Sequence, residues 1–258
     1  MCLAVFALDA HPRYRVVIVA NRDEFHARAT EPARWWNEGW LAGRDLAAGG
    51  TWLGVTRTGR WALLTNIRDP ARHDPSAPSR GALVTTLLAE TRPAAAAIPE
   101  LTAAGGRHNG FNLVGGDGAR AAWGTNRGPG ARDLAPGLHG LSNHVLDTPW
   151  PKVVRTRAAV AAWCAAGEHG EGSLEPLFAA LSDRAVAADT DLPDTGIPLA
   201  RERLLSAPFI VSADYGTRCS TVVTLGRDGE ARFVERSFDP AGRGTGTVDV
   251  RFRLAATP

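Results

Sequence analysis

The sequence has few cysteines, almost no net charge and no long hydrophobic run. Three cysteines in 258 residues, at no spacing that suits a metal, argue against a disulfide framework or a zinc knuckle. The net charge of +2, without a basic block, gives no reason to expect a nucleic acid or an anionic membrane as partner. The apolar run VVIVA is far too short to cross a bilayer. We therefore expect no bound metal, no nucleic acid and no integral membrane segment.

Nothing in the sequence marks export or a domain boundary. The N-terminal segment lacks the basic region and long apolar core of a secretory signal, which favours a soluble, reducing, cytoplasmic setting. A chain of this length buries enough surface to fold without cross-links. Because no repeat or low-complexity linker divides it, we expect a single domain over residues 1–258. Lys152 is the single lysine among 29 basic residues, a bias that resembles codon usage more than an arginine-specific function.

Strand-like segments occupy the first and last thirds of the chain, and helix-like segments lie in the middle. Strands are expected at residues 2–8, 15–20, 51–56, 60–65, 110–114, 119–124, 209–213, 218–225, 231–238 and 247–254, and in the segment GLHGLSN. Helices are expected at residues 80–90, 153–165 and 173–181, and in RPAAAAIPELTAAGG. Strands joined by tight turns pair antiparallel, and the helices then cover the sheet faces. The order predicts an α+β layered domain without the strand–helix alternation of a Rossmann fold.

Cys2 directly follows the initiator methionine and begins the first predicted strand. Methionine aminopeptidase removes Met1 when the next residue is small, which would leave a thiol and a free α-amine on one residue. An α-amine has a pKa of about 7.7–8.0, so it can accept the thiol proton near neutral pH. Cys2 is thus a candidate nucleophile that carries its own general base. The alternative is a small buried hydrophobe near a chain end.

The second predicted strand runs into the charged segment ANRDEF. If the strand continues, Asn21 and Asp23 share one face while Arg22 points to the other. A carboxylate beside Cys2 would orient its amine, which makes Asp23 a candidate catalytic residue. We take Asn21 and Arg22 as candidates for substrate binding. The alternative is a helix N-cap, a position for which Asn and Asp are well suited.

Asn66 and Asn143 end apolar strands, and Arg218 begins a late one. A strand end is a rigid mount for an amide that stabilises an oxyanion, although turn-forming asparagine is the alternative at each position. Arg218 is a candidate for binding a substrate carboxylate or for pairing with Asp23, against the alternative of a surface arginine. Trp52, which follows a glycine-rich loop, and the other tryptophans are candidates either to line an apolar cleft or to pack in the core.

Seven segments together resemble one family over nearly the whole chain. They are MCLAVFA, VVIVANRDEFHARAT, GRDLAAGGTWLGVTRTGRWALLTN, SRGALV, NGFNLVGGD, GLSNHVLDTPWPKV and YGTRCSTVV, in the family's order. On these motifs the chain resembles the NRDE family, whose eukaryotic branch is the transport and Golgi organization protein 2 group. That family is similar to N-terminal nucleophile hydrolases of the choloylglycine hydrolase and penicillin V acylase type. The resemblance implies a four-layer αββα sandwich with mainly antiparallel sheets and the nucleophile at the start of a central strand.

The same resemblance implies a catalytic set with a nucleophile, a carboxylate that orients its amine, an oxyanion donor and a supporting cation. In that order they are Cys2, Asp23, Asn143 and Arg218. The candidates for substrate binding are Asn21, Arg22, Asn66 and Trp52. One position departs from the acylase pattern, because the arginine that begins its segment falls on Ala20, while an extra arginine stands at Arg22.

Two functions remain open. The first is an amidohydrolase that cleaves a non-peptide C–N bond of an acyl amide through a thioester on Cys2, with no cofactor required. The second is a non-catalytic protein on the same scaffold that binds or moves haem or an acyl-lipid, as the eukaryotic branch implies. The departure at Ala20 and the arginine- and tryptophan-rich surroundings favour the second, since arginine can clamp haem propionates. The position of Cys2 and of the Asp and Asn residues favours the first, which we prefer.

Overall fold

Two antiparallel sheets pack face to face at the centre of the molecule. The computed structural model describes residues 2–167 and 173–255. The first sheet, called sheet A, contains β1 (Cys2–Leu8), β2 (Tyr14–Phe25), β10 (Gly137–Leu141), β11 (Tyr215–Gly226), β12 (Glu230–Phe238) and β13 (Gly244–Arg253). Sheet B contains β3 (Thr30–Trp35), β4 (Trp40–Asp45), β5 (Leu53–Thr56), β6 (Arg60–Asn66), β7 (Phe111–Asp117), β8 (Arg120–Thr125) and β9 (Ala131–Leu134). The strand order is β10-β1-β2-β11-β12-β13 in sheet A and sequential in sheet B.

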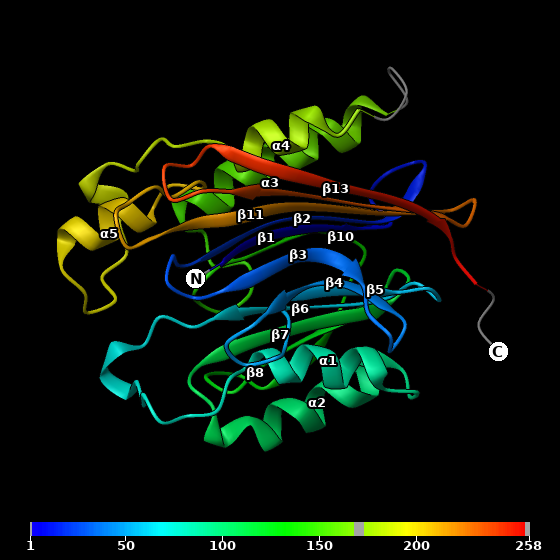
Figure 1. Ribbon diagram of the computed structural model, residues 1–258, viewed down its shortest axis with the longest axis horizontal. Coiled ribbons are helices and arrows are strands. Elements are labelled where there is room, and N and C mark those ends of the chain that lie inside the picture. Colours follow the sequence, from blue (N-terminus) through cyan, green and yellow to red (C-terminus); the bar gives the residue numbers. More distant parts are fainter. Residues whose placement is uncertain (1, 168–172, 256–258) are drawn as a thin grey trace.

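Helices cover the outer face of each sheet, so the molecule has four layers (Figure 1). The longer helices are α1 (Gly81–Ala89), α2 (Ala94–Ala104), α3 (Pro151–Ala166), α4 (Glu175–Leu181) and α5 (Leu199–Leu205). Short 3-10 turns lie at Pro70–Arg72, Gly105–Arg107 and Asp189–Asp191. α3 and α4 pack on sheet A, while α1 and α2 pack on sheet B. The predicted αββα sandwich with antiparallel sheets is confirmed.

Alternate residues of β1 and β2 enter two different apolar layers. Phe6 and Ile18, which are register partners, lie between the two sheets. Their neighbours Val5 and Val19, also register partners, lie under α3 and α4. All four side chains are fully buried. Burial on both faces explains why the segments CLAVFAL and RVVIVA are apolar without the alternation of a half-exposed strand.

Most predicted elements are present with shifted ends, but several predictions are wrong. Residues 209–213 are not a strand, since only a single bridge joins Val211 to Gly216 there. The pattern also did not predict β3, β4, β9 or α5. β3 and β9 are the edge strands of sheet B. Such strands are short and tolerate charge and proline, here Pro32, so they lack the apolar pattern of a strand.

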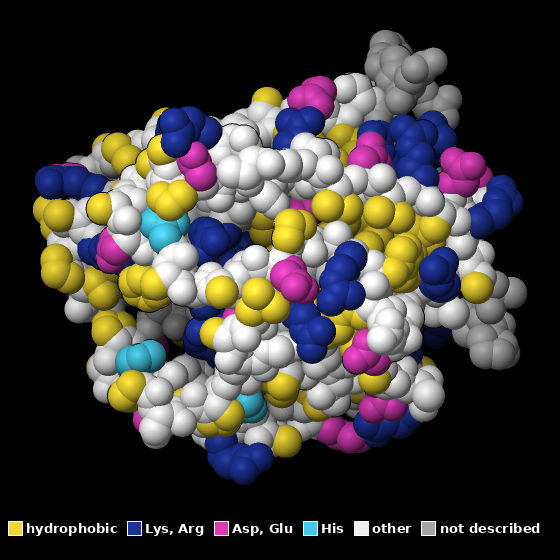
Figure 2. All heavy atoms as spheres, viewed as in Figure 1, with side chains coloured by type: hydrophobic (Ala, Val, Ile, Leu, Met, Phe, Trp, Pro, Cys, Tyr) yellow, Lys and Arg dark blue, Asp and Glu magenta, His cyan; other side chains and the backbone are white. Residues whose placement is uncertain are grey.

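β2 continues through the ANRDEF segment to Phe25. The strand alternative for this segment is therefore confirmed and the helix-cap alternative is wrong. α3 begins at Pro151, two residues before the expected start, because proline is well tolerated in the first turn of a helix. Acidic and basic side chains of the described residues lie in small mixed groups on the face that Figure 2 shows. Among these residues, no helix combines the length and apolar character needed to cross a membrane.

Gly140 of β10 allows the first turn of α3 to approach sheet A closely. A Cβ atom at Gly140 would lie 2.4 Å from Cγ1 of Val153, well inside van der Waals contact. Val153 also forms a small apolar cluster with Leu3 and Trp150. This cluster joins the start of α3 to the start of β1, so the close approach at Gly140 determines how α3 is placed beside Cys2.

We expect the substitution Gly140→Ala to lower the free energy of unfolding by about 1–3 kcal/mol, because the added methyl group overpacks this contact. Urea unfolding followed by circular dichroism measures the change. Gly106→Ala is the matched control, since a Cβ there meets no atom within 4 Å. The control should leave stability unchanged or raise it by about 0.4–1 kcal/mol through the unfolded state. Equal midpoints for Gly140→Ala and the wild type would contradict the expectation.

Candidate active site

Cys2, Arg22 and Cys219 lie side by side in three neighbouring strands. The register pairs Cys2 with Arg22 across β1 and β2, and Arg22 with Cys219 across β2 and β11. Side chains of directly paired residues project from the same face of a sheet. The Arg22 guanidinium stacks on Trp52 at 4.4 Å from the ring centroid and donates to Thr30 Oγ1 at 3.0 Å. Because Trp52 precedes β5 and Thr30 begins β3, this face is the one turned toward sheet B.

Ala20 and Arg22 share this inner face, because they are two residues apart on β2. The backbone partner of Ala20 is Ala4, while that of Arg22 is Cys2. Arg22 therefore carries a guanidinium on the same inner face as Ala20, two residues further along β2. It lies opposite the candidate nucleophile, and its side chain is 5% exposed.

Asp23 points to the opposite face of sheet A, under the helices. It is fully buried, and its Oδ1 accepts a hydrogen bond from Thr217 Oγ1 at 2.7 Å. Burial raises the pKa of Asp23, while the nearby positive charge of Lys152 and the Thr217 hydroxyl lower it. The backbone N–H of Asp23 donates to the thiol of Cys2. The backbone of Asp23 therefore contacts Cys2, while the role expected for its carboxylate stays a prediction.

The thiol of Cys2 is not ionised by its surroundings alone. Burial raises its pKa, and the charge of Asp23 raises it further, while Arg22 and the Asp23 N–H lower it. A thiol in this setting needs a base to become the nucleophilic thiolate at neutral pH. Its backbone is held in place by Ser142, whose Oγ donates to the Cys2 carbonyl at 2.9 Å.

Asn66 and Asn143 meet at the same end of the sandwich, although 77 positions separate them. Asn143 Nδ2 donates to the backbone oxygen of Asn66 at 2.9 Å, and the Arg68 N–H donates to the backbone oxygen of Asn143 at 2.8 Å. Ser142 Oγ, which contacts the Cys2 carbonyl, lies 3.1 Å from Asn143 Oδ1. The first bond uses one of the two amide hydrogens of Asn143. The pair is thus mounted next to Cys2.

Asn21 has a different place from the one expected. Its Nδ2 donates to the carbonyls of Leu181 at 2.8 Å and Pro208 at 2.9 Å. Its Oδ1 accepts from Ser220 Oγ at 2.6 Å, and the residue is 1% exposed. Both amide hydrogens are committed inside the protein. Asn21 therefore ties β2 to the end of α4, and this replaces the expected contact with substrate.

Arg218 also differs from one of its two expected roles. Its Nη1 lies 3.1–3.3 Å from the backbone oxygens of Phe25, His26 and Arg28. In the described chain it forms no ion pair with Asp23, which is bound by Thr217 instead. The physical reason is a β-bulge, because the register of β11 against β2 shifts between Thr217 and Cys219 and leaves Arg218 as the extra residue, with no partner on β2. Arg218 thus fastens the turn between β2 and β3 at the rim of the site.

The sequence pattern did not single out Lys152 as a site residue. Lys152 is 1% exposed in the first turn of α3, and its Nζ makes no hydrogen bond to any residue that the structure describes. Burial lowers its pKa to about 8, while the charges of Asp23 and Cys2 raise it. The available signal was that Lys152 is the only lysine. Unlike arginine, a buried lysine can lose its proton, so the two are not interchangeable here.

The tryptophans mostly follow the core-packing alternative. Five of the eight are buried, namely Trp36, Trp40, Trp61, Trp123 and Trp150. Trp52 is half-buried, and its ring lies over Gly43, where a Cβ would come within 2.4 Å of the ring. Gly43 therefore makes room for the surface on which Arg22 stacks. The ring acts here as a support for a cation more than as the wall of an open apolar cleft.

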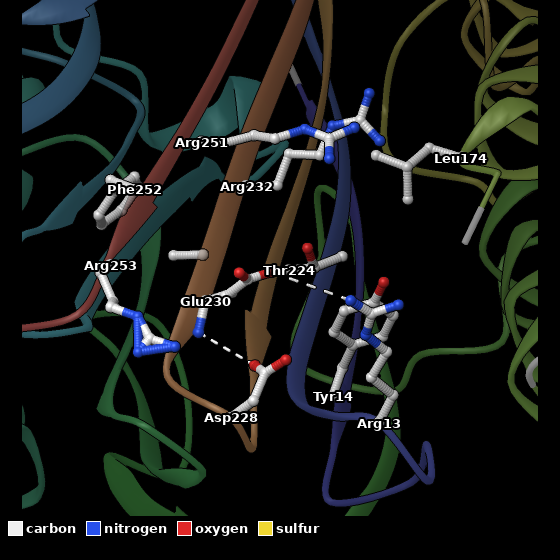
Figure 3. Close-up of a pocket in the computed structure, with 11 residues that line it drawn as sticks. Arg13, Tyr14, Leu174, Thr224, Asp228, Glu230, Arg232, Arg251, Phe252 and Arg253 are labelled. Carbon is white, nitrogen blue, oxygen red and sulfur yellow. Dashed lines mark hydrogen bonds and ion pairs between the residues drawn. The ribbon is translucent and has the colours of Figure 1, made fainter. Parts of the chain in front are cut away.

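One cavity lies away from Cys2. It has a volume of about 610 Å³ and is bordered by Arg13, Tyr14, Glu230, Arg232 and Arg251 among others (Figure 3). Tyr14 begins β2, whereas Cys2 pairs near the other end of that strand. None of the expected site residues lines this cavity. Two of its arginines are already paired, Arg232 with Asp249 at 2.7 Å and Arg13 with Glu230 at 3.9 Å.

Two smaller cavities adjoin the candidate site. One, of about 250 Å³, is lined by the residues that follow the two asparagines, Ile67 and Arg68 after Asn66 and His144 and Val145 after Asn143. The other, of about 150 Å³, is lined by Trp52, Arg218 and Cys219 among others. Among the described residues, no group of three or more His, Cys, Asp or Glu side chains is arranged to hold a metal ion. The site therefore consists of a thiol, amides and paired charges.

Among solved structures, the C2A mutant of conjugated bile acid hydrolase from Clostridium perfringens is similar over 100% of this chain and 99% of its own. The TM-score is 0.48 and the sequence identity 9%. A likeness at this level supports no argument about fold or activity.

The sequence comparisons are much closer. The family described as Transport and Golgi organisation 2 matches residues 1–240. The Transport and Golgi organization protein 2 homolog of Bos taurus is 35% identical over 281 residues, which cover 98% of this chain and 100% of that protein. The Homo sapiens homolog is 33% identical, over 92% of this chain and 93% of its own. The Drosophila melanogaster protein is 28% identical, over 94% and 95%. The chain therefore belongs to the Transport and Golgi organisation 2 family.

Proposed function

We propose that this protein hydrolyses a non-peptide C–N bond of an acyl amide, with Cys2 as the nucleophile. The observation that supports it best is that Cys2, Asp23 and the Asn66–Asn143 pair meet at one end of the sandwich. Nucleophilic catalysis on an amide needs a positioned thiol, a base and donors for an oxyanion. These groups stand on strand ends, which hold them in fixed positions.

The proposed reaction begins with the α-amine of Cys2, which is exposed once Met1 is removed. The amine takes the thiol proton, and Sγ attacks the acyl carbon to give a tetrahedral intermediate. The second amide hydrogen of Asn143 and the side-chain amide of Asn66 stabilise its oxyanion. The ammonium then protonates the leaving nitrogen, so the C–N bond breaks and a thioester remains. Water attacks the thioester, releasing the carboxylic acid and restoring the thiol.

Asp23 and Lys152 have supporting roles in this proposal. The Asp23 carboxylate orients the α-amine and stabilises the ammonium that forms during the reaction. A carboxylate as buried as Asp23 would tend to take up a proton, and the charge of Lys152 opposes that. Lys152 thereby keeps Asp23 ionised at neutral pH without contacting substrate.

Ligand binding without turnover, to haem or to an acyl-lipid, has less support. It was favoured by the loss of an arginine at Ala20 and by an apolar cleft walled with tryptophan. Arg22 supplies a guanidinium on the same face beside Cys2, and most of the tryptophans are buried in the core. Both observations favour the hydrolase.

The first test compares Cys2→Ala with the control Cys164→Ala on a panel of acyl amides, measured as release of the amine. Intact mass spectrometry first establishes that Met1 has been removed. We expect Cys2→Ala to lower turnover about a thousandfold or more, because the covalent step is lost. Cys164 is buried in the layer between α3 and sheet A, so its substitution should leave turnover unchanged. Full activity in Cys2→Ala would overturn the proposed function.

The second test measures alkylation of Cys2 by the neutral reagent iodoacetamide as a function of pH. Lys152 interacts electrostatically with the thiol, and a nearby cation favours the thiolate. Its loss in Lys152→Met should raise the pKa of Cys2 further and slow alkylation at pH 7 by about three- to tenfold. In the wild type, this favourable charge is present below the Lys152 pKa of about 8 and is lost above it. The difference in rate between the wild type and Lys152→Met should therefore shrink as the pH rises above about 8. The α-amine of Cys2 is present in both proteins, so its own titration does not contribute to that difference.

Lys152→Arg is the matched control, since it retains the charge at every pH of the experiment. It should keep the fast alkylation at pH 7 and, unlike the wild type, should also stay faster than Lys152→Met above pH 8. Thermal unfolding of all three proteins checks that the fold is intact. Superimposable profiles for Lys152→Met and the wild type would contradict the coupling of Lys152 to the thiol.

A further inference from the structure

Arg80, from the segment SRGALV, reaches the same end of the sandwich as the two asparagines. It immediately precedes α1 and is half-buried. Its Nη1 donates to the carbonyl of Gly110 at 3.1 Å. The same carbonyl accepts the N–H of Ile67 at 2.8 Å, and Ile67 directly follows Asn66. The guanidinium is therefore placed at the end of β6, beside a proposed oxyanion donor.

The backbone around Arg80 is clamped by the glycine-rich loop that precedes Trp52. The Thr51 N–H lies 3.4 Å from the carbonyl of Gly81. A Cβ at Gly50 would come within 2.5 Å of the Gly81 carbonyl carbon, so only glycine permits this contact. Trp52 and Arg80 thus flank the close contact between residues 50–51 and Gly81. The position of Arg80 does not depend on a flexible loop.

The charges around Arg80 leave it without a carboxylate partner of its own. Glu24 lies 3.9 Å from Arg22 and 4.0 Å from Arg28, and Asp45 is paired with Arg28 at 2.6 Å. In the part of the chain that the structure describes, no carboxylate lies within ion-pair distance of Arg80. Burial lowers the pKa of Arg80, and negative charge at Glu24 and at Cys2 raises it. Arg80 is thus an incompletely paired cation in the electrostatic field of the thiol.

We propose that Arg80 binds a carboxylate group of the molecule that reacts at Cys2. A guanidinium has five N–H donors, and the bond to Gly110 uses one of them. The remaining N–H groups of the guanidinium can donate two parallel hydrogen bonds to a planar carboxylate. The inference rests on the proposed function for the identity of the reacting thiol. It narrows the substrate class to acyl amides that carry a carboxylate.

The test compares two alkylating probes of Cys2 that differ in charge, iodoacetate and iodoacetamide. Both consume the same thiolate, so the ratio of their rates is insensitive to the pKa of Cys2 and reports the binding of a carboxylate. Each ratio is referred to that of N-acetylcysteine under the same conditions, and peptide mapping assigns the adduct to Cys2. We expect the ratio of the iodoacetate rate to the iodoacetamide rate to be about tenfold higher for the wild type than for N-acetylcysteine, as one nearby charge at a partly exposed site would cause.

The informative variant is Arg80→Gln, because glutamine can still donate to the Gly110 carbonyl but carries no charge. Its ratio should fall severalfold toward that of N-acetylcysteine, with a remainder from Arg22 and Lys152, which stay near Cys2 in both proteins. Arg80→Lys should restore much of the preference. Arg120→Met is the charge-matched control. Arg120 is the strand register partner of Asp117, which is in turn the register partner of Arg60, at the opposite end of β6 from Asn66. This control should keep the wild-type ratio. Thermal unfolding shows whether each variant is folded. If Arg80→Gln does not fold, Arg80→Lys tests the proposal.

Two results would overturn the inference. One is a wild-type ratio equal to that of N-acetylcysteine, and the other is a preference for iodoacetate that is undiminished in Arg80→Gln. Neither depends on turnover of an amide. A protein that hydrolyses no amide but shows a preference dependent on Arg80 would refute the proposed hydrolase and support the carboxylate site. Hydrolysis of an amide with no such preference would support the proposed hydrolase and refute the carboxylate site.

Discussion

The contact between the inner faces of the two sheets determines where every group of the candidate site lies. Sheet A is apolar on both faces, so it can be buried only with sheet B on one side and helices on the other. Burial on both sides fixes the register, because a slip of one residue would exchange the two faces of each strand. That register sets Cys2 opposite Arg22 and sends Asp23 to the helix side.

The candidate site occupies one end of this sandwich, where the apolar pattern stops and polar groups begin. Cys2 begins β1, Asn66 ends β6, and Asn143 follows β10, so three strand ends from distant parts of the chain meet. Polar atoms in this position must be bonded to one another, and the contact from Ser142 to the Cys2 carbonyl is one result. The hydrogen bonds that satisfy these buried polar groups also hold the asparagine amides near the thiol.

Charge at this end is arranged so that most groups balance one another in the protein. Arg28 is paired with Asp45, and Lys152 faces the buried carboxylate of Asp23. Arg80, like Arg218, has no carboxylate within ion-pair distance among the described residues, and both donate to backbone oxygens. In a partly buried site an unbalanced guanidinium is costly unless an anion approaches it.

The sequence by itself determined the layered α+β class and marked Cys2, Asp23 and the strand-end asparagines as candidates, but it left open whether the strand before Asp23 continues. Those features depend on residue type and period, which are local. Only the tertiary structure showed that Asn21 uses both amide hydrogens in hydrogen bonds inside the protein and that Arg218 faces away from Asp23. It also brought Lys152 and Arg80 to Cys2, because their positions depend on how helices pack on the sheets. Contacts between segments so distant in the chain leave no periodic signal, so no local pattern reveals them.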